Sequence, residues 1–414
     1  MTGAKSNILE AVGNTPIIKL QKLARHVPAE IYVKCEYLNP GGSMKDRVAR
    51  NIVEDAERRG LLGPGGTIVE ATSGNTGMGL ALVAALRGYA CVFVMPDKMS
   101  QEKVAGLRAF GARVVICPTA VEPEDPRSYY QTAKRIVLET PGAFYANQYH
   151  NPANPEAHYR STAPEIWKQT AGEVDVFVAG MGTGGTISGC GRFFKEKKPG
   201  FRVVGVDPIG SLYYEYVKTG RMTRPFAYYV EGIGEDFLPS TMNLKLVDEI
   251  VRVDDKECFL MTRELVRQEG LFVGGSSGAA VAGAIKYAEA NPPKGNNGKQ
   301  NILVLLPDGA QKYLSKIFDD KWMRENGFLD EPDLLGTVSQ LLRSREQMGK
   351  PRPLVTAKLG AVVRDVITLM RDLPPKVSVM RGRPDETSEA PPATDEMAAA
   401  IHAAKQQLGG GGAS

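Results

Sequence analysis

The chain has 414 residues, which predicts two or three domains, and 43% of them are hydrophobic, enough for a substantial core. The net charge is only +4 and the basic residues form no long run, so we expect no nucleic acid as a partner. The sequence has no apolar stretch of about 18 residues and no signal-peptide core, so we expect a cytoplasmic protein without a membrane partner.

The first distinctive stretch is NPGGSMKDR, residues 39–47, where a glycine-rich turn gives way to a predicted helix at Lys45. A cation at a helix start faces the positive end of the macrodipole, which lowers its pKa. A lysine with a lowered pKa is a nucleophile toward carbonyl carbons. From this stretch alone, an ordinary surface lysine is the simpler interpretation.

From residue 65 onward, short β-branched runs alternate with helical patterns. Near-continuous Val and Ile runs separated by helices are typical of strands buried on both faces, so the pattern predicts an α/β fold with largely parallel sheets. The crossovers should be right-handed. Strands are predicted over 65–71, 90–96, 112–118, 174–180, 202–208 and 301–308, and helices over 75–88 and 100–111.

The stretch EATSGNTG, residues 70–77, joins a predicted strand to a predicted helix. Hydroxyl and amide side chains with glycine at a helix N-terminus can form an anion cradle that suits a carboxylate. A plain helix cap is the alternative, since Ser, Thr and Asn are common caps.

The stretch AGMGTGGTISG, residues 179–189, follows a strand and opens a helix, so its backbone and threonine hydroxyls could approach a phosphate. It also contains a GxGxxG pattern, with an acidic residue ending the next strand. That pattern favours a rival of another class, an NAD-dependent oxidoreductase. The rival rests on Gly180, Gly182, Gly185 and Asp207, and it leaves Lys45 and the 70–77 stretch without a role.

A third glycine-rich stretch, VGGSSGAAVAGA at residues 273–284, has the same composition, and close helix packing is its alternative interpretation. One lysine, one carboxylate cradle and one phosphate loop suit an aldehyde cofactor with a phosphate that meets an amino acid. Pyridoxal 5'-phosphate has this chemistry. A non-catalytic scaffold would leave several such turns unexplained.

These motifs together resemble the cysteine synthase/cystathionine β-synthase family of fold type II pyridoxal-phosphate enzymes. GNTPIIKL, NPGGSMKDR, TSGNTGMGLA, MGTGGTISG, VEGIGEDF and GGSSGAA occur in the family's order between about residues 8 and 329. The resemblance implies two α/β domains with mostly parallel, helix-covered sheets and the cofactor in the interdomain cleft. Within a catalytic core at 1–330, it implies an N-terminal subdomain at about 41–147 and a larger subdomain from 1–40 plus 148–330.

The resemblance also implies roles for individual residues. Lys45 is expected to bond covalently to the cofactor aldehyde, Asn75 to contact its phenolic oxygen and Ser276 to face its pyridine nitrogen. A phosphate cup is expected from Gly182, Thr183, Gly184, Gly185 and Thr186. The substrate contacts are expected from Thr72, Ser73, Thr76 and Gln148 at the carboxylate, Gly232 near the incoming amino acid, and Glu235 at the ammonium of homocysteine.

The implied reaction is a β-replacement that condenses L-serine with L-homocysteine to L-cystathionine, with Lys45 as general base and with hydrogen sulfide as a second expected product. A cysteine synthase that uses O-acetylserine or serine plus sulfide is the nearest rival. A homodimer or higher homo-oligomer is implied too. Glu235 stands where animal members of the family have tyrosine, so their contacts to the second substrate do not transfer directly.

The C-terminal part departs from the family. Residues 331–355 have the composition of a linker, and 356–414 read as a remnant of a regulatory module followed by a flexible tail, so we expect a partly disordered or truncated extension without S-adenosylmethionine control. Animal members carry haem on an N-terminal extension. Few residues precede NILEAVGNTP here, so no haem is expected.

The cysteines and histidines show no metal-ligand spacing, and we expect no metal site. Five cysteines without a CxxC pair predict reduced, mostly buried thiols. The four histidines are expected at the surface or behind other functional groups.

Overall fold

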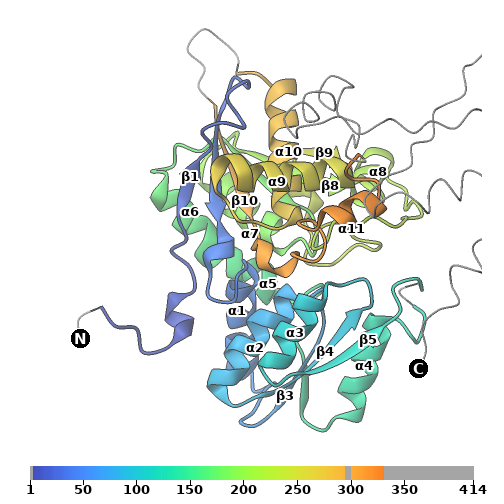
Figure 1. The fold of residues 1–414 in the computed structure, drawn as a ribbon. Helices are drawn as coiled ribbons and strands as arrows, with labels where there is room; N and C mark the ends of the chain where they lie inside the picture. Colours follow the sequence, from blue (N-terminus) through green and yellow to red (C-terminus); the bar gives the residue numbers. More distant parts are fainter. Residues whose placement is uncertain (1–2, 123, 294–299, 331–414) are drawn as a thin grey trace, which may run out of the picture. The chain divides into compact units, whose positions relative to one another are not determined.

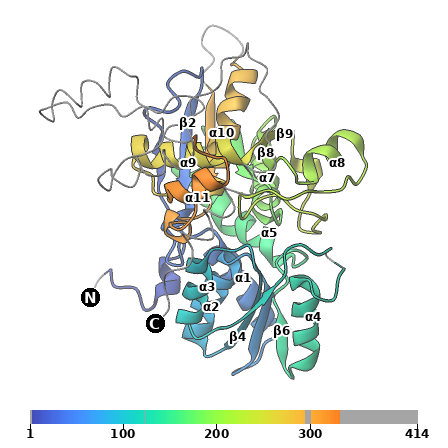
Figure 2. The same cartoon turned by 45° about the vertical axis from the view of Figure 1, so that its right-hand side comes forward.

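A computed structural model describes residues 3–122, 124–293 and 300–330 (Figure 1). The predicted linker and remnant at 331–414 lie outside the described residues. The described residues belong to one compact unit with two sheets, of six and four strands. The four-stranded sheet and its helices lie in the lower half of Figures 1 and 2, and the six-stranded sheet lies above it.

The smaller sheet has the strand order β5-β4-β3-β6, and every neighbouring pair is parallel. Ile68 and Phe93 face a core formed by helices α1, α2 and α3, while Val69 and Val94 face helix α4. Alternate residues of each strand are thus buried on opposite faces, as expected for a sheet covered on both sides. The elements are β3 (Thr67–Ala71), β4 (Ala90–Pro96), β5 (Arg113–Cys117), β6 (Ala143–Tyr145), α1 (Lys45–Arg58), α2 (Asn75–Arg87), α3 (Gln101–Ala109) and α4 (Tyr129–Glu139).

The larger sheet has the order β1-β2-β10-β7-β8-β9, and only the β1–β2 pair is antiparallel. In its centre, Val304 pairs with Val33 on one side and Val178 on the other. Helices α9 and α10 pack on one face, and α6 and α7 pack on the other. Its strands are β1 (Ile17–Lys19), β2 (Glu30–Cys35), β7 (Val176–Gly180), β8 (Arg202–Pro208), β9 (Glu249–Val253) and β10 (Asn301–Leu306).

The remaining helical elements connect or cover this sheet. Helix α9 begins with a capping box in which Asp254 and Glu257 each accept from the other's backbone N–H. The α-helices are α5 (Ala153–Ala157), α6 (Ala163–Gln169), α7 (Gly185–Lys197), α8 (Tyr213–Thr219), α9 (Asp255–Glu269), α10 (Gly275–Ala290) and α11 (Asp320–Glu325). A π-helical turn spans His158–Thr162, and 3-10 turns span Ile8–Ala11, Glu36–Leu38, Leu244–Leu246 and Ala310–Lys312.

Close packing explains part of the glycine content of α10. A Cβ at Gly278 would collide with Thr262 on α9, and a Cβ at Gly283 would lie 2.5 Å from Val206 on β8. The packing interpretation of residues 273–284 therefore holds for the interior of this helix, while the first turn of α10 contributes to the site described below.

The structure confirms the predicted fold class of parallel, helix-covered sheets. Each strand predicted from the sequence is present within two residues of its expected bounds, and the predicted helix at 100–111 ends two residues early, at Ala109. All five cysteines are buried and free, as predicted. Among the described residues, no helix has the length and apolar character needed to cross a membrane.

Candidate active site

Lys45 is the first residue of α1, and its side chain is buried, with 9% of the residue exposed. Within the described part of the chain, its Nζ makes no hydrogen bond or ion pair. Burial lowers the pKa of Lys45 to about 8, against the opposing effect of the carboxylates of Glu235, Asp308 and Glu70. The sequence pattern also predicted a lowered pKa for Lys45, but attributed it to the helix macrodipole. In the structure, burial is the largest cause of the lowered pKa.

Asp308 connects the Lys45 loop to the start of α2. It is fully buried just beyond β10, and Ser43 forms an isolated β-bridge with it. One carboxylate oxygen accepts from Asn75 Nδ2 at 2.8 Å and from the Tyr313 hydroxyl at 2.6 Å. Sequence analysis did not select Asp308. A signal was present, because ligands bind at the ends of buried parallel strands and an acidic residue directly follows such a strand here.

Lys312 orients Asn75 from the other side. Its Nζ donates to Asn75 Oδ1 at 2.7 Å and to the Gly42 carbonyl at 3.0 Å. Burial lowers the pKa of Lys312, while Asp308 raises it. The amide of Asn75 is therefore fixed by an acceptor and a donor, and Nδ2 keeps its second hydrogen for another partner.

The predicted phosphate cup lies between β7 and α7. A Cβ at Gly184, which has a φ of 85°, would lie 2.5 Å from Met242 Cα, and a Cβ at Gly185 would collide with the Asn154 side chain. Thr183 Oγ1 accepts from Asn154 Nδ2 at 3.0 Å. Only glycine fits these two positions, so the backbone N–H groups at the start of α7 stay open to an anion.

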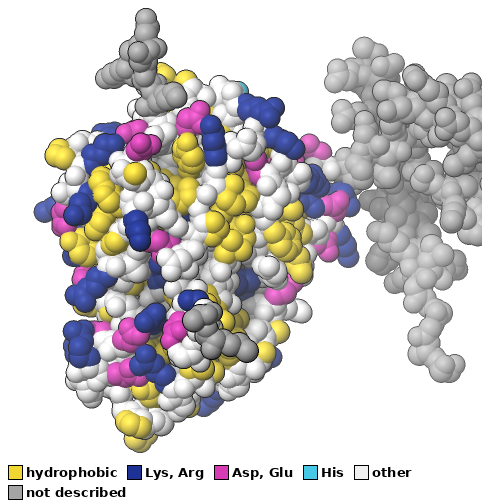
Figure 3. All heavy atoms as spheres, turned by 90° about the vertical axis from the view of Figure 1, so that its left-hand side faces the viewer, with side chains coloured by type: hydrophobic (Ala, Val, Ile, Leu, Met, Phe, Trp, Pro, Cys, Tyr) yellow, Lys and Arg dark blue, Asp and Glu magenta, His cyan; other side chains and the backbone are white. Residues whose placement is uncertain are grey.

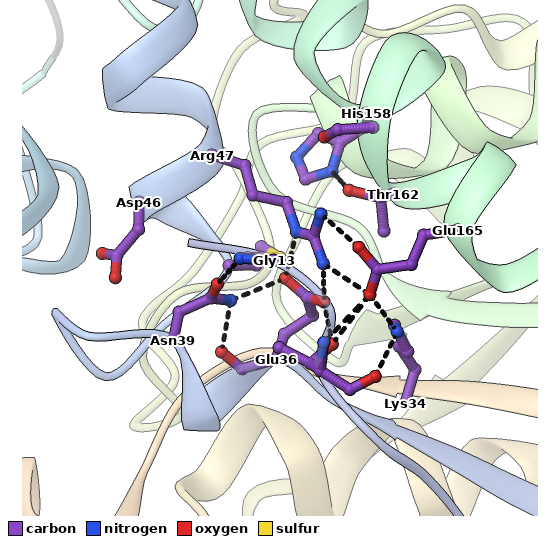
Figure 4. A network of polar contacts seen from close by, with 12 residues as sticks. Gly13, Lys34, Glu36, Asn39, Asp46, Arg47, His158, Thr162 and Glu165 are labelled. Atoms are coloured by element: carbon purple, nitrogen blue, oxygen red, sulfur yellow. Dashed lines mark hydrogen bonds and ion pairs between the residues drawn. The ribbon is translucent and has the colours of Figure 1, made fainter. Parts of the chain in front are cut away.

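His158 supports the last residue of this cup. Its Nε2 lies 3.1 Å from the hydroxyl oxygen of Thr186, and its Nδ1 lies 2.9 Å from that of Thr162. Burial, with Lys45 and Arg47, lowers the pKa of His158 well below its usual value, so the ring is neutral and carries one N–H. Figure 4 shows His158 and Thr162 beside the Arg47 guanidinium. Sequence analysis expected the histidines at the surface or behind other functional groups, but it did not single out His158 for this role.

The residues predicted to hold the substrate carboxylate gather at the start of α2. The Thr76 hydroxyl donates to Gln148 Oε1 at 2.5 Å. Thr72 Oγ1 accepts from the backbone N–H groups of Gly74 and Gly77, and Ser73 stands half-buried in the same loop. The N-cap residue of α2 is Gly74, and Thr72 orders the loop that precedes it while its hydroxyl proton stays available to a ligand.

The two residues predicted near the incoming amino acid lie on the loop at 231–235, which packs on the phosphate cup. A Cβ at Gly182 would lie 2.9 Å from the Gly232 carbonyl oxygen. Glu235 is half-buried, and its carboxylate makes no hydrogen bond within the described residues. Burial and Asp236 raise the pKa of Glu235 well above its usual value, whereas Lys45 and Lys98 lower it.

Ser276 lies in the first turn of α10 and is 3% exposed. Its hydroxyl has no hydrogen-bond partner among the described residues. The Gly274 N–H donates to the Asp308 carbonyl at 3.0 Å, which holds the start of α10 at the same strand end as Asn75. The structure therefore brings together the glycine-rich stretches that the sequence analysis selected.

The structure does not support the NAD-dependent oxidoreductase hypothesis, because Asp207, its expected ribose ligand, has another role. Asp207 ends β8 fully buried and accepts from the Tyr214 N–H at 2.9 Å, at the start of α8. A Cβ at Gly180 would collide with Ile233, so this glycine serves packing. A fully buried carboxylate is not accessible to a ribose, so the GxGxxG pattern was a misleading signal.

A buried ionic network fixes the start of α1 behind Lys45 (Figure 4). Arg47 donates two hydrogen bonds of 2.8 Å to Glu36, which lies in the 3-10 turn after β2. It also donates a hydrogen bond of 2.9 Å to Glu165 on α6. Lys34 also pairs with Glu165. Burial raises the pKa of Glu36, but Arg47 more than offsets this and holds it below the usual value. Helix α1 is thereby anchored to the larger sheet two residues beyond Lys45.

Comparison with known proteins agrees with this geometry. A family model described as "Pyridoxal-phosphate dependent enzyme" matches residues 8–308. The chain is 46% identical over 325 residues to a cystathionine beta-synthase of Apis mellifera, a match that covers 78% of this chain and 63% of the other. The chain spans about three fifths of the length of the curated animal relatives that it matches.

Two solved structures are similar as well. An O-acetylserine dependent cystathionine beta-synthase from Helicobacter pylori is 37% identical with a TM-score of 0.69, covering 76% of this chain and 98% of the other. A hydrogen sulfide-producing enzyme from Fusobacterium nucleatum is 35% identical with a TM-score of 0.69, covering 75% of this chain and 100% of the other.

Proposed function

The chain belongs to the family of pyridoxal-phosphate-dependent enzymes, and from this premise we propose that it catalyses a β-replacement on L-serine, with L-homocysteine as the incoming thiol and L-cystathionine as the product. The relatives named cystathionine beta-synthase support this choice of reaction. The observation that carries the proposal is the Lys45 amine, which is buried, has no partner among the described residues, and is neutral in part at physiological pH because its pKa is about 8.

The residues of the site fit the family's cofactor. Gly184 and Gly185 leave no room for a side chain and thus keep the backbone at the start of α7 accessible to a phosphate. Ser276 offers a neutral hydroxyl, and Asn75 offers a free N–H. Pyridoxal phosphate, when bound, withdraws electrons from the α-carbon of an amino acid.

The residues of this chain would act as follows. Lys45 takes up the α-proton at Nζ and delivers a proton to the leaving β-hydroxyl. The Asp308 carboxylate stabilises its cationic form, since it raises the pKa of Lys45. Thr76 and Gln148 bind the substrate carboxylate.

Glu235 would bind the ammonium of homocysteine. Burial makes this carboxyl reluctant to ionise, and no neighbouring cation pairs with it directly. An arriving ammonium supplies that partner and favours the ionised carboxylate. A pocket of this kind selects an amino-acid thiol over free sulfide.

Cysteine synthesis from O-acetylserine or serine plus sulfide is the second candidate, and release of hydrogen sulfide is a further expected activity. Both are supported by the solved relatives from Helicobacter pylori and Fusobacterium nucleatum, whose descriptions include O-acetylserine dependence and hydrogen sulfide production.

Product analysis tests the proposal. Purified protein with pyridoxal phosphate is given serine plus homocysteine and, separately, O-acetylserine plus sulfide. Cystathionine formed faster than cysteine supports the first candidate, and the reverse supports the second. Lys45→Ala should abolish both reactions and the borohydride-trapped adduct, and an adduct on another residue would contradict the assignment.

We propose further that the protein is a homodimer or higher homo-oligomer in the cytoplasm and that no haem or metal takes part. We also propose that residues of about 41–147 form one subdomain, in which the part around Thr72 to Gly111 moves to close on the substrate. Figure 3 shows hydrophobic side chains between charged ones across one face. The large hydrophobic residues exposed in the described part of the chain include Ile18 and Leu38. Multi-angle light scattering of the purified chain tests the oligomeric state, and a monomer would contradict it.

A further inference from the structure

Lys103 on α3 is a buried lysine to which neither the sequence nor the proposed reaction assigns a role. Only 3% of the residue is exposed. Its Nζ lies 2.6 Å from a carboxylate oxygen of Glu231 and 4.6 Å from the centre of the Tyr313 ring. An ammonium group held between a buried carboxylate and the face of an aromatic ring is restricted to one geometry.

The aliphatic part of Lys103 packs under the loop that begins α2. Gly74 in this loop has a φ of 121°, and a Cβ there would lie 2.9 Å from Lys103 Cδ and 3.1 Å from its Cγ. Gly74 is flanked by Ser73 and Asn75, which we assign to the substrate and the cofactor. The loop at 72–76 therefore rests directly on the stem of Lys103.

The charged end of Lys103 holds the other loop. Glu231 precedes Gly232, whose carbonyl lies against the phosphate cup. The Glu231 side chain is 4% exposed, and its second oxygen lies 2.8 Å from Lys316 Nζ. Burial raises the pKa of Glu231, but Lys103 and Lys316 more than offset this, and the carboxylate stays ionised. The loop at 231–235 is thus tied to two lysines.

Two further contacts hold α3 without touching either loop. The Ser100 hydroxyl donates to the Lys312 carbonyl at 2.6 Å, and Glu102 accepts from the backbone N–H and the hydroxyl of Ser315. These contacts fasten the start of α3 to the chain after β10. Lys103 differs from them because its two ends contact the two substrate loops.

We propose that Lys103 is a positioning residue that couples the loop at 72–76 to the loop at 231–235, so that binding of the first amino acid organises the site of the second. The inference rests on the proposed function, because it uses the roles assigned to both loops. Coupling of this kind is reciprocal, so loss of the side chain should weaken both substrates.

The test compares Lys103→Met with Lys316→Met in the holoenzyme. Both variants remove one cation from Glu231, but the side chain that lies against Gly74 is that of Lys103, so Lys316→Met is the matched control. We expect Lys103→Met to raise the KM of serine and the KM of homocysteine by about tenfold each, with a smaller change in kcat. Lys316→Met should change neither KM by more than about twofold. Lys103→Arg keeps the aliphatic stem and the positive charge, so both of its KM values should lie close to those of the wild type.

Three outcomes would overturn the coupling. One is a lower unfolding temperature of Lys103→Met with both KM values unchanged, which would mark a purely structural role. Another is a change in only one KM, and the third is an equal effect of Lys316→Met. If Lys103→Met does not fold, Glu231→Gln replaces it, since it removes the charge from the second loop and should also raise both KM values. A wild type that forms no cystathionine refutes the proposed function instead, before any variant is compared.

Discussion

Asn75 donates a hydrogen bond to Asp308 at 2.8 Å across a separation of 233 positions in the sequence. The bond joins the start of α2, which follows a strand of the smaller sheet, to the residue that follows β10 in the larger one. Carboxyl ends of parallel strands from both sheets therefore meet at one point, as ligand sites in α/β folds commonly require. Lys45 and Ser276 are fixed at the same point.

Replacing Asp308 should test how strongly this bond matters. Asp308→Asn exchanges the carboxylate for an amide, and hydrogen bonds to charged groups contribute about 1.5–3 kcal/mol. We expect cofactor affinity, measured by absorbance titration, to fall about tenfold or more. Tyr313→Phe removes the other donor from the same oxygen and leaves Asn75 bound. An equal loss in both variants would show that Asn75 is not the residue that Asp308 positions.

The pKa of Lys45 predicts the pH dependence of covalent cofactor capture by the apoprotein. A lysine with a pKa of about 8 is neutral to about one tenth at pH 7 and to about nine tenths at pH 9. The capture rate, followed by stopped-flow absorbance, should therefore rise about tenfold between these values and then level off. A rate that still climbs steeply from pH 9 to pH 10.5 would indicate an ordinary lysine.

His158 should influence the cofactor's phosphate through Thr186. His158→Phe removes the partners of the Thr186 and Thr162 hydroxyls while it fills the buried space, and loss of a buried hydrogen bond costs about 1–3 kcal/mol. We expect about tenfold weaker cofactor binding and a shifted phosphorus NMR signal of the bound phosphate. Thr162→Val is the control, because it leaves the bond to Thr186 intact. An unshifted phosphorus signal in His158→Phe would show that His158 does not influence the phosphate through Thr186.

Glu165 should contribute strongly to stability. It binds Arg47 and Lys34 and also accepts from the Asn14 N–H, and removing one partner of a buried ion pair costs about 3–5 kcal/mol. Glu165→Ala should lower the urea midpoint accordingly. Glu54→Ala, which breaks the exposed pair with Arg50, should cost less than about 1 kcal/mol.

The same network predicts how the stability of the protein changes with pH. Burial raises the pKa of Glu165, but Arg47 and Lys34 hold it below the usual value of 4.5. A carboxyl with a lowered pKa in the folded state stabilises the protein above its unfolded pKa, and this contribution is lost as the pH falls through the folded value. Wild-type stability should thus drop below about pH 4.5 more steeply than that of Glu165→Gln. Parallel curves would contradict the assignment.

Ser276 should tune the cofactor's ring. A neutral hydroxyl leaves the pyridine nitrogen unprotonated, whereas an aspartate would keep it protonated and make the ring a stronger electron sink. Ser276→Asp should therefore strongly reduce β-replacement, measured as cystathionine formation. Ser277→Ala is the matched control, since the neighbouring Ser277 is buried, its hydroxyl has no partner in the part of the chain that the structure describes, and it should tolerate the change. Undiminished activity of Ser276→Asp would refute this role.

The sequence predicted the parallel strands well because their Val and Ile runs depend on burial alone, as in β4 over Ala90–Pro96. The sequence analysis did not predict short or polar strands such as β6 and β9, because their partly exposed residues show no clear hydrophobic periodicity. The antiparallel strand β1, at Ile17–Lys19, is also short and mostly exposed.

The glycine-rich stretches could be found from the sequence because turns and helix starts are local. Their partners could not. Asp308, His158 and Lys103 reach the site from elements distant in the chain, and a single charged or aromatic residue in a helix or after a strand has many uses. Asp207 shows the converse, since a local pattern suggested a ligand contact and tertiary packing gave it a capping role.

All five cysteines are buried, and burial raises the pKa of Cys35 and of Cys91 to about 12. Disulfide exchange requires a thiolate, so the thiols of Cys35 and Cys91 would react very slowly even where oxidised thiol compounds accumulate. A protein that handles homocysteine or sulfide would thereby avoid forming mixed disulfides with its own substrates, and it would keep working through swings of cellular redox state that inactivate proteins with exposed sulfhydryl groups.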